Sequence, residues 1–250
     1  MILSKKEMLQ IVKKQLATDL NCSPEDFEKN GFIFCEAKEN PGRRLFPRGD
    51  KHFEMLTMGG AVIVSSVPEI LLYVKEQLDG KSRDDAFYMP FVQSFCICFL
   101  PDNPQALLLS EGYEFKLLFR SEIIKLYDKC NKTDFPYALS YDISHQRPDM
   151  VATAAYKNDE LIGIAGVSKD SEMLWQIGIN VLTGHRNHAI ASVLTNLLTI
   201  EVLKQGKIPY YATAPGNIAS QRTAINAGYK PAWTCAYRGI FNGEITLPVC

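Results

Sequence analysis

The segment Gln176–Ala191, QIGINVLTGHRNHAIA, contains the pattern that decides the fold of this chain. Alternating apolar residues over Leu174–Val181 predict a strand, and a polar stretch at 182–189 then leads into a helix. Several backbone N–H groups at the start of such a helix lack intrahelical partners, so this junction favours a phosphate or pyrophosphate group. Small side chains would let that group approach the backbone closely, and they are Gly184, Ala189 and Ala191.

The chain around this segment alternates between strand and helix patterns. Apolar residues spaced three and four apart mark the long helix after the junction, which Gly206 ends. A turn at Asn158-Asp159 joins two strands before the junction. The expected strands are 113–119, 150–156, 161–168, 174–181 and 210–214, and the expected longer helices are 190–203 and 220–227.

The first part of the chain has a pattern of its own. Ser4 and Glu7 have the spacing of a capping box before an amphipathic stretch, and Gly59-Gly60 predicts a tight hairpin. The sequence PDNP at 101–104 then breaks the chain. We therefore expect a smaller α/β domain at residues 1–112, of unknown role, and a second domain at residues 113–250.

Composition excludes several classes of function. With 27 basic and 28 acidic side chains the net charge is −1, which points to neither nucleic acid nor a membrane surface as a partner. Seven cysteines occur without paired C-x-x-C motifs, so we expect no metal site and a reducing compartment. The N-terminus lacks the apolar region of a signal peptide, and we expect a cytoplasmic protein.

Two spaced motifs resemble those of the GNAT superfamily of N-acetyltransferases. Val181, Arg186, Ala189 and Ala191 follow the pattern V-x-x-x-x-R-x-x-A-x-A, which is similar to the acetyl-CoA motif of that family. The order N-x-x-S at 217–220, followed by Gly-Tyr at 228–229, resembles its second motif. The resemblance covers about residues 115–250. It implies a mixed, largely antiparallel sheet flanked by helices, preceded here by the smaller α/β N-terminal domain.

The resemblance also implies where acetyl-CoA would bind as the cosubstrate. The loop amides at 186–191 would hold its pyrophosphate, and the strand edge at 179–181 would pair with its pantetheine arm. Gly178 would mark a local bulge or splay that makes room for the arm. The implied cofactor residues are Ile179, Asn180, Val181, Arg186, Asn187, His188, Ala189, Ile190, Ala191, Asn217 and Ser220.

Two positions depart from the family pattern. Ala189 stands where the family usually has glycine, and alanine tolerates a helical φ. Ala224 stands where many members carry a tyrosine that acts as the general acid. The missing phenol puts the usual protonation step in question.

The expected reaction is direct transfer of an acetyl group to a primary amine of a small molecule or peptide. Glu172 is the candidate base, with Gln176 on the same face of the strand, and the alternative is a hydrated carboxylate at a strand end. His185 and His188 are either catalytic or solvated loop side chains. A non-catalytic acyl-CoA-binding regulatory module is the rival function, and a homodimer is left open.

Overall fold

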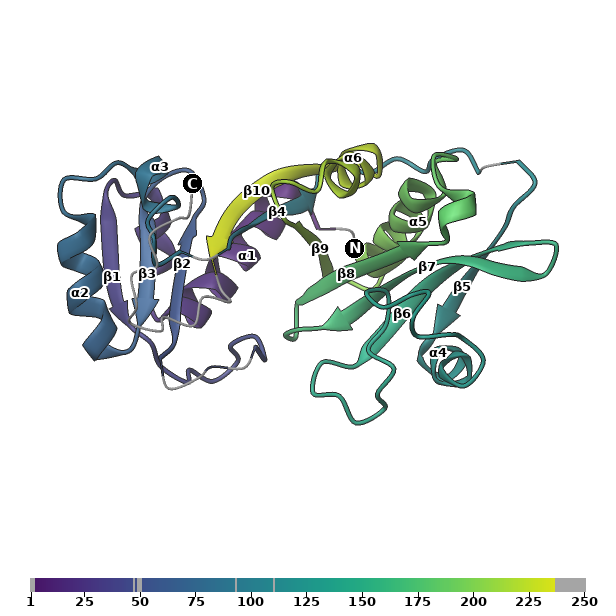
Figure 1. Cartoon of the computed structure of the whole chain (residues 1–250), viewed down its shortest axis with the longest axis horizontal. Coiled ribbons are helices and arrows are strands. Elements are labelled where there is room, and N and C mark those ends of the chain that lie inside the picture. The colour runs from purple at the N-terminus through teal and green to yellow at the C-terminus, as the bar shows by residue number, and fades with distance from the viewer. Residues whose placement is uncertain (1–2, 47, 49–50, 93, 110, 237–250) are drawn as a thin grey trace. The chain divides into compact units, whose positions relative to one another are not determined.

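The computed structural model describes residues 3–46, 48, 51–92, 94–109 and 111–236. The chain divides into two compact units (Figure 1), each described here by itself. The C-terminal unit comprises residues 3–8, 99–212 and 217–230, and the N-terminal unit comprises residues 9–98, 213–216 and 231–236. Because neither unit is one continuous segment, the expected boundary between residues 112 and 113 stays a prediction.

The sheet of the C-terminal unit has the strand order β4-β9-β8-β7-β6-β5. All neighbours from β8 to β5 are antiparallel, whereas β8 and β9 are parallel. The sheet is therefore mixed and largely antiparallel, which confirms the expected fold class. The strands are β4 Cys96–Pro101, β5 Glu114–Phe119, β6 Asp149–Lys157, β7 Glu160–Lys169, β8 Leu174–Val181, β9 Ile208–Thr213 and β10 Tyr229–Ala236, of which β10 begins here.

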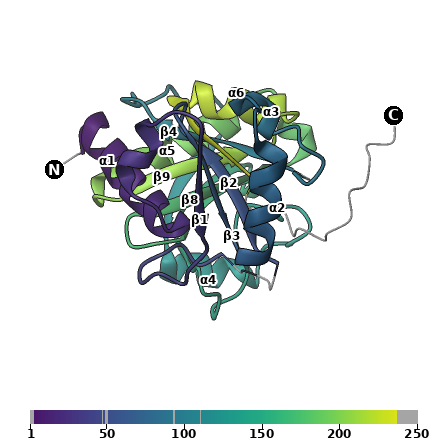
Figure 2. The ribbon, with the colours of Figure 1, turned by 90° about the vertical axis from the view of Figure 1, so that its left-hand side faces the viewer.

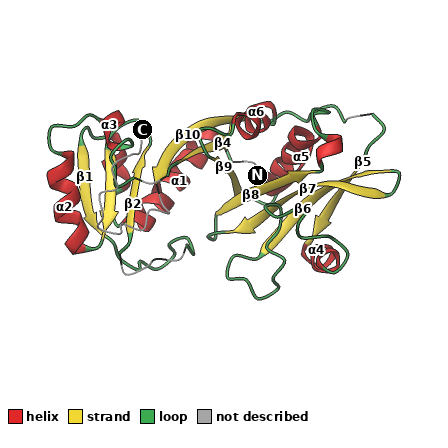
Figure 3. Ribbon diagram, in the orientation of Figure 1, coloured by secondary structure: helices red, strands yellow, loops and turns green. Residues whose placement is uncertain are grey.

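Helices lie on both faces of this sheet (Figure 3). Helix α5, Ile190–Lys204, covers β6, β7 and β8 on one face, and α4, Arg120–Tyr127, packs on β5 and β6 with an apolar cluster around Ile123. The 3₁₀ helix η2, Thr183–His185, precedes α5. Helix α6, Ile218–Asn226, begins two residues before the expected start because Asn217 caps it. The long helix that the sequence predicts after the junction is confirmed.

The turn between β6 and β7 shows how local chemistry sets this fold. Asn158 and Asp159 have φ angles of 50° and 65°. Two successive left-handed residues match the twist of a hairpin, and these two residue types tolerate that conformation best after glycine. The expected turn is therefore found at the expected place.

The strands of the N-terminal unit follow the order β1-β3-β2-β10. Strand β1 is parallel to β3, whereas β2 is antiparallel to both β3 and β10. Helices α1 and α2 lie on opposite sides of these strands (Figure 2), and α2 covers a core that includes Phe53, Val64 and Val74. The elements are α1 Lys5–Leu20, which begins in the C-terminal unit, η1 Pro24–Glu28, β1 Phe32–Glu36, β2 Phe53–Thr57, β3 Val62–Ser66, α2 Pro68–Leu78 and α3 Arg83–Ala86.

The glycines between β2 and β3 serve a close approach as well as a turn. A Cβ at Gly60 would lie 2.2 Å from the carbonyl oxygen of Phe27, so no side chain fits there. Gly59 has a φ of 104°, a conformation that L side chains rarely adopt. A hairpin is present, but it is not the expected tight turn: the last pair is Thr57 with Val62, so residues 58–61 form the connection, and only Gly59 of the two glycines has a positive φ.

Candidate functional site

Strands β8 and β9 separate part-way along their length. Their parallel pairing runs from Leu174, opposite Ile208, to Ile177, opposite Tyr211, and no further pair joins the two strands, which are described in full. Strand β8 continues to Val181, paired only with β7. We call this opening the strand fork: the β9-facing edge of residues 178–181. An open main-chain edge of this kind can receive an extended ligand as an added strand.

Gly178 lies where β8 and β9 splay apart, and it also allows another segment to approach the sheet. The register between β7 and β8 is unbroken through the pair Gly166 and Gly178. A Cβ at Gly178 would lie 1.8 Å from the carbonyl oxygen of Tyr137, and one at Gly166 would lie 2.3 Å from that of Ala138. The two glycines therefore admit the chain at 137–138 onto the face of the sheet. Of the two expected features, the bulge is absent at Gly178, whereas β8 and β9 splay apart directly before it.

Beyond the fork, the loop at 182–189 folds back on itself. The backbone N–H of Arg186 donates to the carbonyl of Thr183 at 3.3 Å, and its Nε donates to the carbonyl of Val181 at 3.2 Å. The Arg186 amide is thus engaged inside the loop. Asn187 has a φ of 66°, so the chain reverses its direction directly after Arg186.

The start of α5 supplies the donors that the sequence predicts. Val193 donates to the carbonyl of Ala189 at 3.0 Å, which is the first bond of the helix. The N–H groups of Ile190, Ala191 and Ser192 precede that bond and have no intrahelical acceptor by geometry. The helix dipole adds partial positive charge at the same point, so this end of α5 can bind an anion.

Ala189 adopts the left-handed conformation rather than a helical one. Its φ is 58° and its ψ is 2°. This corrects the expectation that alanine sits here with an ordinary helical φ. The glycine of the family pattern would adopt this conformation without strain, whereas an alanine costs about 1–2 kcal/mol.

Glu172 lies outside the strand that it was expected to open. Strand β8 begins at Leu174, and the exposed carboxylate of Glu172 pairs with Lys207 at 2.7 Å and with Lys169 at 2.9 Å. Hydrogen bonds from Lys207 and Lys169 lower the pKa of Glu172 to about 2. A carboxylate of that pKa is a weak base, so its surroundings argue against proton abstraction, and its role stays a hypothesis.

Gln176 lies on the face of the sheet that carries the 137–138 segment. It is half-buried, with Ser168 of β7 and Tyr210 of β9 as its neighbours across the strands. Asn180 points to the same face, where its Oδ1 accepts the N–H of Tyr137 at 2.8 Å. The side chain of Asn180 therefore anchors that segment.

Sequence reasoning missed a buried carboxylate beside this face. Asp170 follows β7 and is completely buried. Its carboxylate accepts hydrogen bonds from the Ser168 hydroxyl at 2.9 Å and from the Tyr210 hydroxyl. A guanidinium nitrogen of Arg147 lies 3.3 Å from Asp170 Oδ1. These partners are up to 40 residues from Asp170, so no local spacing could have indicated the cluster.

The residues expected to contact pantetheine from α6 also organise the helix itself. The side chain of Asn217 accepts the N–H of Ser220 at 3.1 Å, which caps the helix. Ser220 Oγ in turn lies 2.8 Å from the hydroxyl of Tyr211 on β9. One turn further along, Ala224 is fully buried. Tyr211 was not among the predicted site residues.

The two loop histidines pack beside an aromatic ring. The centroid of Tyr113 lies 6.0 Å from that of His185 and 6.2 Å from that of His188. Lys157 Nζ lies 5.1 Å from the same Tyr113 ring centroid. These contacts are consistent with both histidines being loop side chains without a catalytic role.

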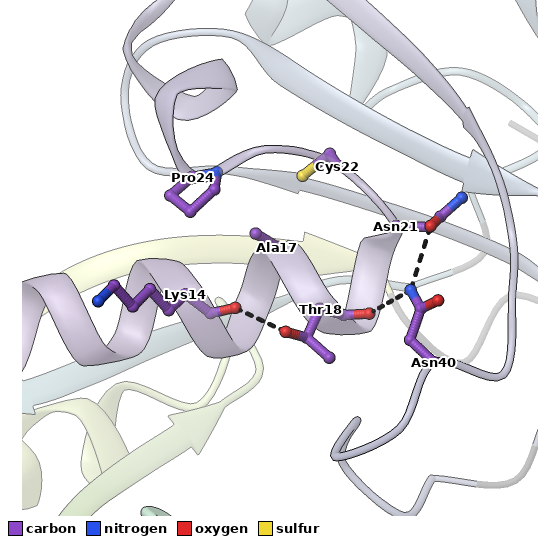
Figure 4. A pocket seen from close by; sticks show the side chains of 7 residues that line it. All are labelled: Lys14, Ala17, Thr18, Asn21, Cys22, Pro24 and Asn40. Carbon is purple, nitrogen blue, oxygen red and sulfur yellow. Dashed lines mark hydrogen bonds between the residues drawn. The ribbon is translucent and has the colours of Figure 1, made fainter.

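The N-terminal unit contains a separate hollow of about 360 Å³ beside α1. Figure 4 shows the side-chain amide of Asn40, which donates hydrogen bonds to the carbonyl of Thr18 at 2.9 Å and to Oδ1 of Asn21 at 3.2 Å. Its lining residues are Lys14, Ala17, Thr18, Asn21, Cys22, Pro24 and Asn40. A hydrogen bond with the Cys22 thiol lowers the pKa of Cys35. None of the residues predicted for the site lies here.

Two further properties concern the described part of the chain. It holds no group of three or more His, Cys, Asp or Glu side chains arranged to bind a metal ion. Over the same residues, every helix is too short or too polar to cross a membrane.

The family model described as "Acetyltransferase (GNAT) family" matches residues 119–229. This segment is a GNAT acetyltransferase domain. It contains the strand fork, the loop and both helices α5 and α6. The wider extent expected from the sequence, 113–250, stays a prediction. A comparison with curated proteins found no match.

Several solved structures resemble the chain. A GNAT acetyltransferase from Novosphingobium aromaticivorans has 13% identity and a TM-score of 0.44, covering 57% of this chain and 62% of that one. A GCN5-related N-acetyltransferase-like protein from Streptococcus suis has 15% identity and a TM-score of 0.45, covering 71% and 79%. An aminoglycoside N-acetyltransferase in complex with CoA has 17% identity and a TM-score of 0.37, covering 50% and 93%. This chain thus spans 62% of the length of the Novosphingobium protein.

Proposed function

We propose that the GNAT domain transfers an acetyl group from acetyl-CoA to a primary amine of a small molecule or peptide. The observation that carries this proposal is the strand fork, which ends at the N-terminus of α5. An extended, uncharged arm with an anionic end fits such a site. The arm can pair with the main chain, and the anion can accept the N–H groups of the helix.

The direction of the cofactor follows from these two ends. The pyrophosphate would contact the amides of residues 187–191, at the open end of the fork. The pantetheine arm would then take the place of Arg186 Nε at the Val181 carbonyl and run back along Val181, Asn180 and Ile179 toward the last β8–β9 pair at Ile177. Four strand residues span about 13 Å, so the thioester would lie close to that closed end of the fork.

The chemistry at the closed end would be direct attack by the amine. The thioester carbonyl can accept a backbone N–H of β8, which stabilises the oxyanion that develops during attack. Asn217 and Ser220 would border the arm from α6. We propose that Gln176 orients the incoming amine or a water, and we assign the loss of the amine proton to solvent because Glu172 is a weak base.

Calorimetry with acetyl-CoA tests binding. We expect a dissociation constant between about 1 μM and 1 mM, or roughly −8 to −4 kcal/mol. Ala189→Glu should abolish binding because it places a carboxylate where the phosphate charge must lie. Ala189→Gly is the matched control and should bind at least as well as the wild type. Normal binding by Ala189→Glu would place the pyrophosphate elsewhere.

A non-catalytic acyl-CoA-binding module remains the second candidate. It is favoured by Ala224, which supplies no acid, and by the weak basicity of Glu172. Release of the CoA thiol in the presence of a panel of primary amines separates the two functions. Binding without amine-dependent thiol release would favour the module.

We also propose that the protein works in a reducing cytoplasm. The support is chemical: six cysteines in the described residues are free thiols, including the neighbouring pair Cys98 and Cys235, whose sulfur atoms lie 3.8 Å apart. An oxidising compartment would favour joining such neighbours.

A further inference from the structure

Tyr211 occupies the closed end of the strand fork. It is the last residue of β9 that pairs with β8, opposite Ile177. Residues in register on parallel strands direct their side chains to the same face of the sheet. Ile177 shares its face with Val181, whose partner Gly163 lies against Leu194 of α5. The Tyr211 side chain therefore points to the helical face.

The hydroxyl of Tyr211 ends at α6. It lies 2.8 Å from Ser220 Oγ, and the Tyr211 side chain is almost completely buried. Burial raises the pKa of Tyr211, and the hydrogen bond with Ser220 offsets this only in part. The phenol therefore keeps its proton at neutral pH, as a proton donor must.

We propose that Tyr211 donates a proton to the sulfur of CoA as that thiol leaves. This inference rests on the proposed function, because it takes the thioester to lie at the closed end of the fork. The amine nitrogen bonds to the thioester carbon, and the C–S bond then breaks. Sulfur takes the proton of Tyr211, while the amine gives one proton to solvent. Ser220 relays a proton from solvent back to Tyr211, so the net products are an amide and free CoA thiol.

The neighbouring hydroxyls are placed for other tasks. Tyr210 points to the opposite face, where it donates to Asp170. The hydroxyl of Tyr229 is hydrogen-bonded to the hydroxyl of Thr199 at 2.6 Å, and the Tyr229 side chain is almost fully buried. Ala224, one helical turn beyond Ser220, is completely buried and carries no donor. Tyr211 is the phenol that joins the fork to α6.

Tyr211→Phe tests the proposal because it removes only the hydroxyl. Tyr229→Phe is the matched control, since it removes another buried hydroxyl from the same unit. Thiol release from acetyl-CoA is measured with a panel of amines and, because the acceptor is unidentified, also with water alone. Calorimetry with acetyl-CoA, a circular dichroism spectrum and a pH–rate profile are recorded for each variant.

We expect Tyr211→Phe to lower kcat at least about tenfold, toward the range typical of lost general-acid catalysis, with little change in acetyl-CoA binding. The fall in rate at high pH, where the phenol of the wild type loses its proton, should disappear. Ser220→Ala should show a smaller loss, and Tyr229→Phe should keep the wild-type rate and profile.

Three results would overturn the proposal, and they can be told apart. If Tyr211→Phe binds acetyl-CoA and keeps the wild-type kcat and pH profile, Tyr211 is not the proton donor, although the proposed function stands. If the wild type itself fails to bind acetyl-CoA, the proposed function fails and the role of Tyr211 fails with it. An equal loss in Tyr211→Phe and Tyr229→Phe would mean that both act only through packing.

Discussion

Replacing Ala189 by glycine should stabilise the C-terminal unit. Ala189 has a φ of 58° and a ψ of 2°, in the left-handed region. An L side chain there costs about 1–2 kcal/mol, and glycine removes that cost. Glycine also gives the unfolded chain more freedom, which offsets about 0.4–1 kcal/mol. The net gain in the free energy of unfolding should therefore be about 0–1.6 kcal/mol, with a central value near 0.8 kcal/mol or roughly 2–3 °C in Tm.

Chemical denaturation followed by tryptophan fluorescence measures this change, because Trp175 lies buried in β8 of the same unit. Ala191→Gly provides the control, since Ala191 lies in the first turn of α5, where glycine costs up to about 1 kcal/mol. The two substitutions are chemically identical and two residues apart, yet their effects should have opposite signs. A loss of stability in both variants would refute the left-handed assignment of Ala189.

Three further changes have outcomes that the structure fixes. Gly178→Ala should cost at least about 1–3 kcal/mol of unfolding free energy, since its Cβ would lie 1.8 Å from a backbone carbonyl oxygen, whereas Gly184→Ala, with no atom within 4 Å, should cost little in the same denaturation assay. Because the pKa of Glu172 is lowered from 4.5 to about 2, its contribution to stability should be complete above pH 4.5 and lost as the pH falls toward 2. The dependence of Tm on pH over this range should therefore be weaker in Glu172→Gln, and an unchanged dependence would contradict the argument. Iodoacetamide at neutral pH should modify Cys35, whose pKa is lowered, well before the buried Cys98, as mass spectrometry of timed samples can check; the reverse order would argue against a thiol pair at Cys35.

Features set by residues close in sequence could be predicted from the sequence. The turn at Asn158-Asp159 depends on two residues that accept a positive φ. Helix α5 follows from apolar periodicity, and the open N–H groups at its start follow from helix geometry alone. The family model then matches the segment in which these patterns occur.

Features set by distant residues could not be predicted. Glu172 has a low pKa because Lys207, 35 residues away, reaches it. The carbonyl of Tyr137 requires glycine at position 178, and nothing within β8 indicates that contact. The contact between Tyr211 and Ser220 depends on how β9 and α6 pack, which no spacing within either element specifies. Ala189 differs again, because its φ is unusual for its residue type.

The pair of glycines at 166 and 178 has a consequence for the face that carries Gln176. The carbonyls of Tyr137 and Ala138 contact the main chain of the two glycines directly, with no side chain between them. The distance of the 137–138 segment from the sheet is therefore set by contact between the two backbones. No substitution within the sheet can lower the segment further, and any substitution of either glycine must lift it. The side chain of Tyr137 is 79% exposed, so this backbone contact does not restrict its size. The depth of this face should therefore stay the same as long as both glycines are kept, whichever side chain stands at position 137.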